Sequence, residues 1–466
     1  MSMRTVSPSL MCCLLFALSS CGQDEGPGAA AAFSQPALPP DAKSDTRDAG
    51  TGVRDAGAAF RDAGTQITQP DAGSPPPPAL VSSIVIDPAT RTSSKFFGFD
   101  LKTDASGTLH AAYAPGGRPR YGRCATDCTR PSSWAWLSLN ESIPASGLHL
   151  AVSRGGRVYL AWTSLGADFA VRYAACRYGN CLAPSGWTIT TLLSSSTAGM
   201  AEGGHSLAVD ATGVIHMIAN ASVYDRWYLT CSANCDAAGS WSVARLGAAC
   251  ERSSIAVGTN SVGVVCSDSG VLKYSHCSSL TACASDTSWR TVQLSNNSYR
   301  EVALEFQGNA PRVAHGVSGG RNIWSCESGC ETLANWSGIA WRSSTSNPAM
   351  SFNTGNPVVA WGGAGEVEVL ACSAGSACWI PGSSWLNFGS VDDEAQSAAT
   401  VSPKPQNCPN GYPPFAIRDL LSGTAVVADS RGAFVLTSVN DLVGCDGNSA
   451  SYREVNYRLQ LSFVPL

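Results

Sequence analysis

Short apolar runs separated by turn-forming residues recur along residues 79–466 and set the expected fold. The segment Leu207–Gly247 shows the pattern clearly, because four apolar runs follow one another between Asp, Gly, Asn and Ser residues. The runs span about four to seven residues and are rich in Val, Ala, Tyr and Trp, which favours strands over helices. The same segment carries a close cysteine pair, Cys231 and Cys235, followed by Trp241.

This unit is repeated along the chain. The first cysteine of each close pair recurs at intervals of 46 to 55 residues. A repeat of that length with four short strands is typical of a β-propeller blade, whose small inner strands surround a central channel. We therefore expect an all-β chain folded as a seven-bladed β-propeller of four-stranded blades, with six or eight blades left open. The units begin at Phe99, Leu148, Leu207, Ser254, Val302, Met350 and, in degenerate form, near Phe415.

One terminal strand should close the ring, because an open last blade would leave an unpaired edge. Two segments qualify, Leu80–Asp87 and Tyr452–Val464. We expect one of them to supply the outer strand while the other lies against it.

The centre of the unit, seen as "LKTDASGTLH" and "LAVDATGVIH", resembles the repeat of BNR/sialidase-like propellers. The resemblance covers most of residues 95–440 and implies the propeller fold. The sialidase Asp-box, Ser-x-Asp-x-Gly-x-Thr-Trp, is not intact in any copy.

The N-terminus has the pattern of an export signal. Arg4 precedes the apolar run Leu10–Leu18, which is too short to span a bilayer as a helix. The run ends in Leu-Ser-Ser-Cys, which resembles the bacterial lipobox and implies a signal peptide at residues 1–20 and lipidation of Cys21. We expect the chain to be anchored in a bacterial cell envelope, and Gly22 favours the outer membrane. An ordinary cleaved signal is the alternative.

Residues 21–78 are predicted to be a disordered tether. They consist largely of Ala, Gly, Pro and Asp, with almost no large apolar side chains that could form a core. The expected domain organisation is therefore a signal at 1–20, a tether at 21–78 and a propeller at 79–466.

Cysteine pairing accounts for all cysteines of the propeller. Of 19 cysteines, Cys12 and Cys13 leave with the signal and Cys21 takes lipid, so 16 remain. In an exported protein such pairs indicate disulfides, whereas a structural zinc site needs four ligands close together. We expect neither a metal nor a cofactor. The predicted disulfides are Cys124–Cys128, Cys176–Cys181, Cys231–Cys235, Cys250–Cys266, Cys277–Cys283, Cys326–Cys330, Cys372–Cys378 and Cys408–Cys445.

The low charge of the chain excludes one class of function, and its charged residues gather at one place in the predicted fold. Charged residues make up 14% of the chain and the net charge is -5, so nothing resembles the basic footprint of a nucleic-acid binder. The protein is expected to be a monomer. Polar and charged residues gather where the chain enters the inner strands, which should place them around one mouth of the channel. These candidates are Glu202, His205, Glu251, Arg252, Tyr299, Arg300, Glu301 and Asp392–Glu394.

Three functions remain open at this stage. The preferred one is a binding module for a glycan or a protein surface. The first alternative is a polysaccharide-degrading enzyme, because "EGGHSLAVDATGVIHM" resembles propeller lyases of the BNR type. That resemblance implies proton transfer by His205 and Tyr299 and charge neutralisation by Arg252 and Arg300, and a sialidase-like glycosidase would add Glu251. The second alternative is a structural envelope protein. His110 and His216 share one repeat position and are expected to be structural.

Overall fold

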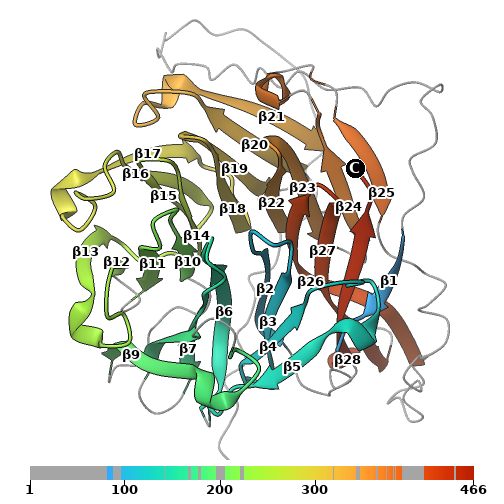
Figure 1. Ribbon diagram of the computed structural model, residues 1–466. Helices are drawn as coiled ribbons and strands as arrows, with labels where there is room; N and C mark the ends of the chain where they lie inside the picture. Colours follow the sequence, from blue (N-terminus) through green and yellow to red (C-terminus); the bar gives the residue numbers. More distant parts are fainter. Residues whose placement is uncertain are drawn as a thin grey trace, which may run out of the picture. The chain divides into compact units, whose positions relative to one another are not determined.

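The computed structural model contains seven four-stranded antiparallel sheets arranged in a ring, and it confirms the seven-bladed propeller (Figure 1). The inner strand of each sheet contacts the inner strand of the next, and β26 contacts β2, so the ring is closed. The residues described are 81–87 and 96–466, except 142, 166–168, 177–179, 196–204, 221–224, 318–319, 343–346, 364–365, 374, 381–382, 384, 391–413 and 446–447.

Six blades run in chain order from the inner to the outer strand. Blade 1 has β2 (Phe96–Thr103), β3 (Leu109–Pro115), β4 (Arg120–Cys124) and β5 (Ala135–Ser138). Blade 2 has β6 (Ala145–Val152), β7 (Val158–Leu165), β8 (Phe169–Cys176) and β9 (Trp187–Ser195). Blade 3 has β10 (Ser206–Val209), β11 (Ile215–Asn220), β12 (Arg226–Cys231) and β13 (Ser242–Gly247). Blade 4 has β14 (Arg252–Val257), β15 (Val262–Asp268), β16 (Val271–Cys277) and β17 (Trp289–Ser295).

The remaining blades follow the same plan with longer strands at the end of the chain. Blade 5 has β18 (Tyr299–Gln307), β19 (Ala310–Val317), β20 (Gly320–Cys326) and β21 (Trp336–Arg342). Blade 6 has β22 (Asn347–Asn353), β23 (Asn356–Gly363), β24 (Glu366–Ala371) and β25 (Leu386–Ser390). Blade 7 has β26 (Pro414–Asp429), β27 (Gly432–Cys445), β28 (Asn448–Val464) and β1 (Val81–Val85).

The N-terminal candidate closes the ring. In the last blade β1 is the outer strand and pairs with β28, with Val81 opposite Phe463 and Ile84 opposite Leu461. The segment Tyr452–Val464 therefore forms part of the third strand of that blade, and the segment Leu80–Asp87 contains the closing strand. A blade built from both ends of the propeller joins the two ends of the ring by backbone hydrogen bonds.

The first five blades pack on one another through aromatic side chains. A tyrosine on the third strand of one blade meets the edge or face of a tryptophan that opens the outer strand of the following blade, in the T-shaped geometry that aromatic pairs favour. These rings lie within hydrophobic clusters between the sheets. The pairs, with their centroid separations, are Tyr121–Trp187 at 5.3 Å, Tyr173–Trp241 at 5.0 Å, Tyr228–Trp289 at 4.9 Å and Tyr274–Trp336 at 4.9 Å.

The cysteine pair holds that tryptophan in place. In blade 4, for example, the disulfide Cys277–Cys283 closes the turn after β16, and the Trp289 indole Nε1–H donates to the Cys283 carbonyl oxygen at 2.9 Å. A single 3₁₀ turn brings the chain from the second cysteine to the tryptophan. Such turns are η2 (Pro131–Ser133), η3 (Pro184–Gly186), η4 (Ala238–Ser240), η5 (Asp286–Ser288) and η6 (Leu333–Asn335), while η7 (Gly375–Trp379) differs in sequence.

Seven of the eight predicted disulfides are present. They comprise the six close pairs and Cys250–Cys266, with Cα–Cα separations of 5.5 to 5.9 Å. For the eighth, Cys408 and the side chain of Cys445 lie outside the described residues, as do the predicted signal, Cys21 and the tether.

Asp87, directly after the closing strand, provides a test of ring closure. Its carboxylate is 1% exposed, accepts a hydrogen bond from Tyr113 Oη at 2.5 Å and pairs with Arg120 Nε at 2.8 Å. We expect Asp87→Ala to lower the free energy of unfolding by about 3 kcal/mol, because it removes the carboxylate that pairs with Arg120 and bonds Tyr113. Urea unfolding with the disulfides intact measures this.

The matched control is Asp225→Ala, which removes a carboxylate from the more exposed pair with Arg245. Exposed pairs contribute about 1 kcal/mol or less. Equal losses for the two variants would show that Asp87 does not fasten the ring.

Candidate functional site

Charged side chains from separate blades meet on the axis of the ring. Asp100 and Lys102 alternate along β2 and so share the face toward the axis, and Lys102 Nζ lies 3.5 Å from Asp100 Oδ1. Glu305 of β18 interacts electrostatically with both. Burial opposes the charge on Lys102, but the two carboxylates outweigh it and raise the pKa of the lysine. Burial raises the pKa of Glu305, and Lys102 opposes that change.

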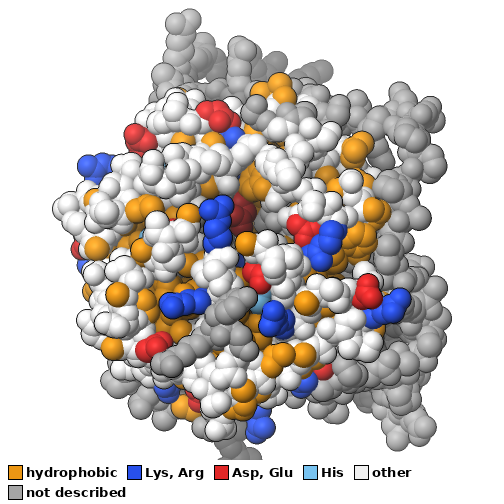
Figure 2. Space-filling view, in the orientation of Figure 1, with side chains coloured by type: hydrophobic (Ala, Val, Ile, Leu, Met, Phe, Trp, Pro, Cys, Tyr) orange, Lys and Arg blue, Asp and Glu red, His pale blue; other side chains and the backbone are white. Residues whose placement is uncertain are grey.

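The mouth of the channel carries an ion pair between two blades. Arg252 opens β14 and Glu301 lies near the start of β18, and Arg252 Nε lies 2.8 Å from Glu301 Oε1. About a third of each side chain is exposed, so a ligand can reach both groups and replace either one as the partner of the other. Figure 2 shows basic and acidic side chains beside a recess near the centre of this face.

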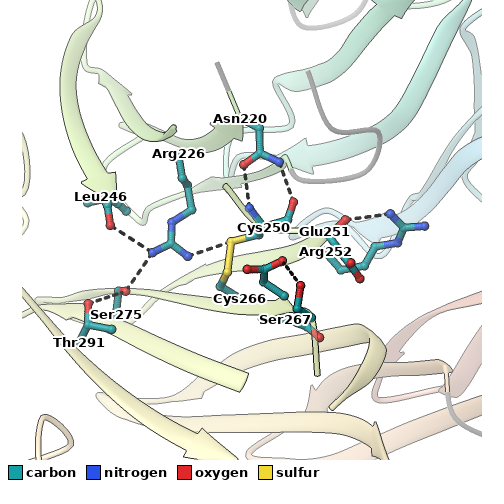
Figure 3. Close-up of a disulfide and its surroundings, with 12 residues drawn as sticks. Asn220, Arg226, Leu246, Cys250, Glu251, Arg252, Cys266, Ser267, Ser275 and Thr291 are labelled. Atoms are coloured by element: carbon teal, nitrogen blue, oxygen red, sulfur yellow. Dashed lines mark hydrogen bonds between the residues drawn. A yellow bond between two sulfur atoms is a disulfide. The ribbon is translucent and has the colours of Figure 1, made fainter. Parts of the chain in front are cut away.

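A disulfide fixes the chain directly before Arg252. Cys250–Cys266 joins the entry of β14 to β15, and the side-chain amide of Asn220 both donates to and accepts from the backbone of Cys250, at 2.7 and 3.1 Å (Figure 3). The buried guanidinium of Arg226 donates to Cys250 Sγ at 2.9 Å. Burial lowers the pKa of Arg226 to about 10, which leaves it charged at neutral pH. The segment directly before Arg252 is therefore fixed by the disulfide and by hydrogen bonds from Asn220 and Arg226.

Two histidines lie beside this cluster. The rings of His149 and His205 meet edge to face at a centroid distance of 5.3 Å, and His205 Nδ1 lies 3.3 Å from Thr163 Oγ1. Burial, with the positive charges of Lys102 and Arg252, lowers the pKa of His149 to about 4. Burial lowers the pKa of His205 to about 3, and the neighbouring His149 adds to this effect. Both rings are thus neutral at physiological pH.

Inner strands are tied to one another by side-chain-to-backbone hydrogen bonds at one repeat position. Asp100 Oδ2 accepts from Leu150 N of the next blade at 3.0 Å. The same bond recurs from Ile255 N to Ser206 Oγ at 3.3 Å and from Leu304 N to Ser254 Oγ at 3.2 Å. These bonds fix the spacing of the strands from which the channel cluster projects.

The structure brings part of the sequence-predicted set together. Arg252 and Glu301 form the interblade pair, and the Glu251 carbonyl oxygen accepts from Arg252 Nη1 at 2.8 Å. His205 is 1% exposed and packs against His149. Tyr299 and Arg300 begin β18, but their side chains lie outside the described residues, as do Glu202 and Asp392–Glu394.

Sequence reasoning missed Asp100, Lys102 and Glu305. Their signal was present as charged residues alternating with apolar ones inside predicted inner strands, in a chain with few charges. The entries to the strands were selected instead, because only those residues recur as polar groups in several units.

The repeated histidines belong to buried triads beneath the turns. His110 Nδ1 lies 2.7 Å from Tyr121 Oη, and His110 Nε2 lies 3.3 Å from Asp104 Oδ2. The carboxylate of Asp104 also accepts from the backbone of its own turn, at Thr108 N. Blade 3 repeats this arrangement with Asp210, His216 and Tyr228. The Asp-x-x-Gly-x-h-His pattern is thus explained by structure: the aspartate bonds the backbone of the turn, and the buried histidine lies against that aspartate.

Neither a metal cluster nor a membrane-spanning helix is found. Within the described part of the chain, no group of three or more His, Cys, Asp or Glu side chains could hold a metal ion. The same residues contain no helix long and apolar enough to cross a bilayer.

Comparison with known proteins finds similarity in the solved structures only. No family model and no curated protein matches the chain. The hydrazine synthase of Kuenenia stuttgartiensis is 11% identical, with a TM-score of 0.41 over 59% of this chain and 76% of that one. A lectin of Aleuria aurantia in complex with Fucα1-6GlcNAc is 12% identical, with a TM-score of 0.39 over 67% and 95%. The propeller domain of the Trilobed protease of Pyrococcus furiosus is 8% identical, with a TM-score of 0.37 over 77% and 98%.

The buried histidines predict an acid-sensitive fold. Unfolded histidine binds a proton below a pKa of about 6.5, whereas His205 in the folded state stays neutral down to about 3. The unfolded chain therefore binds more protons over this interval, and stability should fall as the pH drops from 6.5 toward 4. His205→Gln should reduce that slope by up to about 1.4 kcal/mol per pH unit, as measured by urea unfolding across the interval. An unchanged slope in the variant would contradict this assignment.

Proposed function

We propose that this chain is an exported carbohydrate-binding module that receives a glycan at the channel mouth. The observation that supports it is that three blades of a weakly charged chain bring charged side chains to the channel. Asp100, Lys102 and Glu305 form one interacting group, and Arg252 and Glu301 form an ion pair at the mouth. Charges placed along a narrow channel add little stability by themselves, because the cost of desolvation offsets most of their attraction. Such groups are available for recognition.

The balance of charge indicates a ligand rich in hydroxyl groups. The cluster offers two cations and three carboxylates, so it presents fixed donors and fixed acceptors close together. Sugar hydroxyls donate and accept at neighbouring positions, and they bring no net charge that the cluster would have to neutralise. A polyanion would be repelled by the carboxylates, and a polycation by Lys102 and Arg252.

The histidines favour recognition over bond cleavage. A general base acts best with a pKa near the operating pH and must reach the proton that it removes. His205 is 1% exposed, and burial lowers its pKa to about 3. These properties argue against the lyase role that the sequence resemblance implies for His205.

Export is supported by the disulfides. Seven of them in one propeller are typical of an extracellular or exported protein. We further propose that the monomeric propeller is anchored by lipid at Cys21, in the outer membrane, with residues 21–78 as the spacer.

A glycan array followed by calorimetry with the best-bound glycan tests the proposal. Arg252→Ala and Lys102→Met should each weaken the affinity by about tenfold or more, because each removes a charge-assisted hydrogen-bond donor from the site. Arg245→Ala is the matched control, since Arg245 lies on the outer strand of blade 3 and forms an ion pair with Asp225 there, away from the channel.

Two outcomes would contradict the proposal. One is an array on which no glycan binds above background, and the other is equal affinity in Arg252→Ala, Lys102→Met and Arg245→Ala. Release of an unsaturated, ultraviolet-absorbing product from a bound uronic-acid polymer would instead support the enzyme alternative.

A further inference from the structure

Blade 2 departs from its neighbours at three positions of the repeated turn. Ser153 stands where blades 1 and 3 have Asp, and Tyr159 stands where they have His. Arg157 stands where blade 1 has Thr and blade 3 has Val. The shorter serine accepts a hydrogen bond from Arg157 N at 3.0 Å, and Tyr159 takes the place of the histidine under the turn. Where its neighbours have a buried triad, blade 2 therefore has an arginine and a second tyrosine.

These changes leave one hydroxyl without a partner. In blades 1 and 3, Tyr121 Oη and Tyr228 Oη lie 2.7 and 2.6 Å from the Nδ1 atoms of His110 and His216. Tyr173, the equivalent residue of blade 2, is 0% exposed, and its Oη has no hydrogen-bond partner among the described residues. An unsatisfied buried hydroxyl is costly, so its retention needs a reason.

Tyr173 lines a pocket of about 380 Å³ between blades 2 and 3. That volume lies in the range of roughly 300–1,000 Å³ typical of small-molecule sites. Tyr173 and Tyr159 are stacked, with ring centroids 6.2 Å apart. The other residues around the pocket are Arg157, Ala175, Cys176, Thr188, Gly213, Ile215 and 232–236.

Charged groups surround the pocket near its opening. Arg157 and Asp236 are exposed, and neither forms an ion pair within the described part of the chain. Burial raises the pKa of Tyr173, Tyr159 and Asp236 raise it further, and Arg157 opposes them, which shows that the hydroxyl senses these groups. Thr190 Oγ1 donates to the Asp236 carbonyl oxygen at 2.7 Å and joins the two blades beside the pocket.

We propose that this pocket binds a single neutral sugar ring between Arg157 and Asp236 at its rim, and that the entering ring shifts the side chains that cover Tyr173 Oη and takes up its hydrogen bond. The floor offers a neutral hydroxyl between aromatic rings, where a ligand's carboxylate or ammonium group would be desolvated without a counter-charge. A sugar hydroxyl can donate to or accept from Tyr173, and the planar groups of Arg157 and Asp236 suit adjacent ring hydroxyls.

This site is separate from the channel mouth. The pocket lies between blades 2 and 3, with Arg157 and Gly213 in the turns that follow β6 and β10, and none of its lining residues belongs to the charged groups of the channel. The inference therefore does not rest on the proposed function.

Saturation-transfer NMR and calorimetry on the full chain test the inference. The probes are glucose, galactose, mannose, fucose and N-acetylglucosamine, with glycine and glutamate as zwitterionic comparisons. We expect at least one sugar to bind and neither amino acid to do so. Tyr173→Phe should weaken the binding by about fivefold and Arg157→Ala by about tenfold, because each removes a donor to the ring. Arg252→Ala should leave this binding unchanged.

Tyr274→Phe is the matched control. Tyr274 Oη is also buried and unpartnered among the described residues, but Tyr274 is outside this pocket. Without ligand, Tyr173→Phe and Tyr274→Phe should raise the unfolding midpoint slightly, because each removes a buried hydroxyl that has no partner among the described residues. Tyr228→Phe should lower the midpoint, because it deprives His216 of its partner.

Three results would overturn the proposal. They are the absence of binding by every sugar, binding of an amino acid in preference to the sugars, and sugar binding that Tyr173→Phe and Arg157→Ala leave unchanged. A midpoint lowered as much in Tyr173→Phe as in Tyr228→Phe would show that the hydroxyl is already satisfied, and would equally overturn it.

Discussion

Edge-to-face packing between the tyrosine of one blade and the tryptophan of the next joins the first five blades of this ring. The tryptophan is oriented by the carbonyl oxygen of a disulfide-bonded cysteine, as Trp289 is by Cys283. A bridge across so short a loop removes little chain entropy, about 2 kcal/mol on the entropic model, so its larger effect is to position the ring. The same contact recurs at the four interfaces from blade 1 to blade 5 and stabilises this part of the ring.

A ring held at its periphery crowds its inner strands together on the axis. Hydrogen bonds such as that from Leu150 N to Asp100 fix the spacing of these strands. Lys102 and Glu305 come from blades far apart in the sequence and interact electrostatically there. The rigidity that the aromatic pairs give to the periphery is thus what keeps oppositely charged groups at fixed positions in the channel.

Repetition also explains how a second kind of site can arise without a change of fold. In blades 1 and 3 the tyrosine hydroxyl beneath the turn is bonded to the histidine of the Asp–His–Tyr triad. In blade 2, Ser153 and Tyr159 replace two of its members, and the backbone stays the same while a pocket opens beside Tyr173. A scaffold stabilised by contacts that lie elsewhere tolerates such local substitution.

The sequence by itself determined the all-β class, the four-stranded unit, the number of blades and seven observed disulfides, because strand periodicity and cysteine spacing are local properties of the chain. It also selected Arg252 and Glu301, which recur as polar groups at strand entries. Only the tertiary structure decided that β1 closes the ring, that Lys102 interacts electrostatically with Glu305, and that Tyr173 Oη has no hydrogen-bond partner among the described residues. These depend on contacts between residues distant in sequence, which neither spacing nor composition encodes.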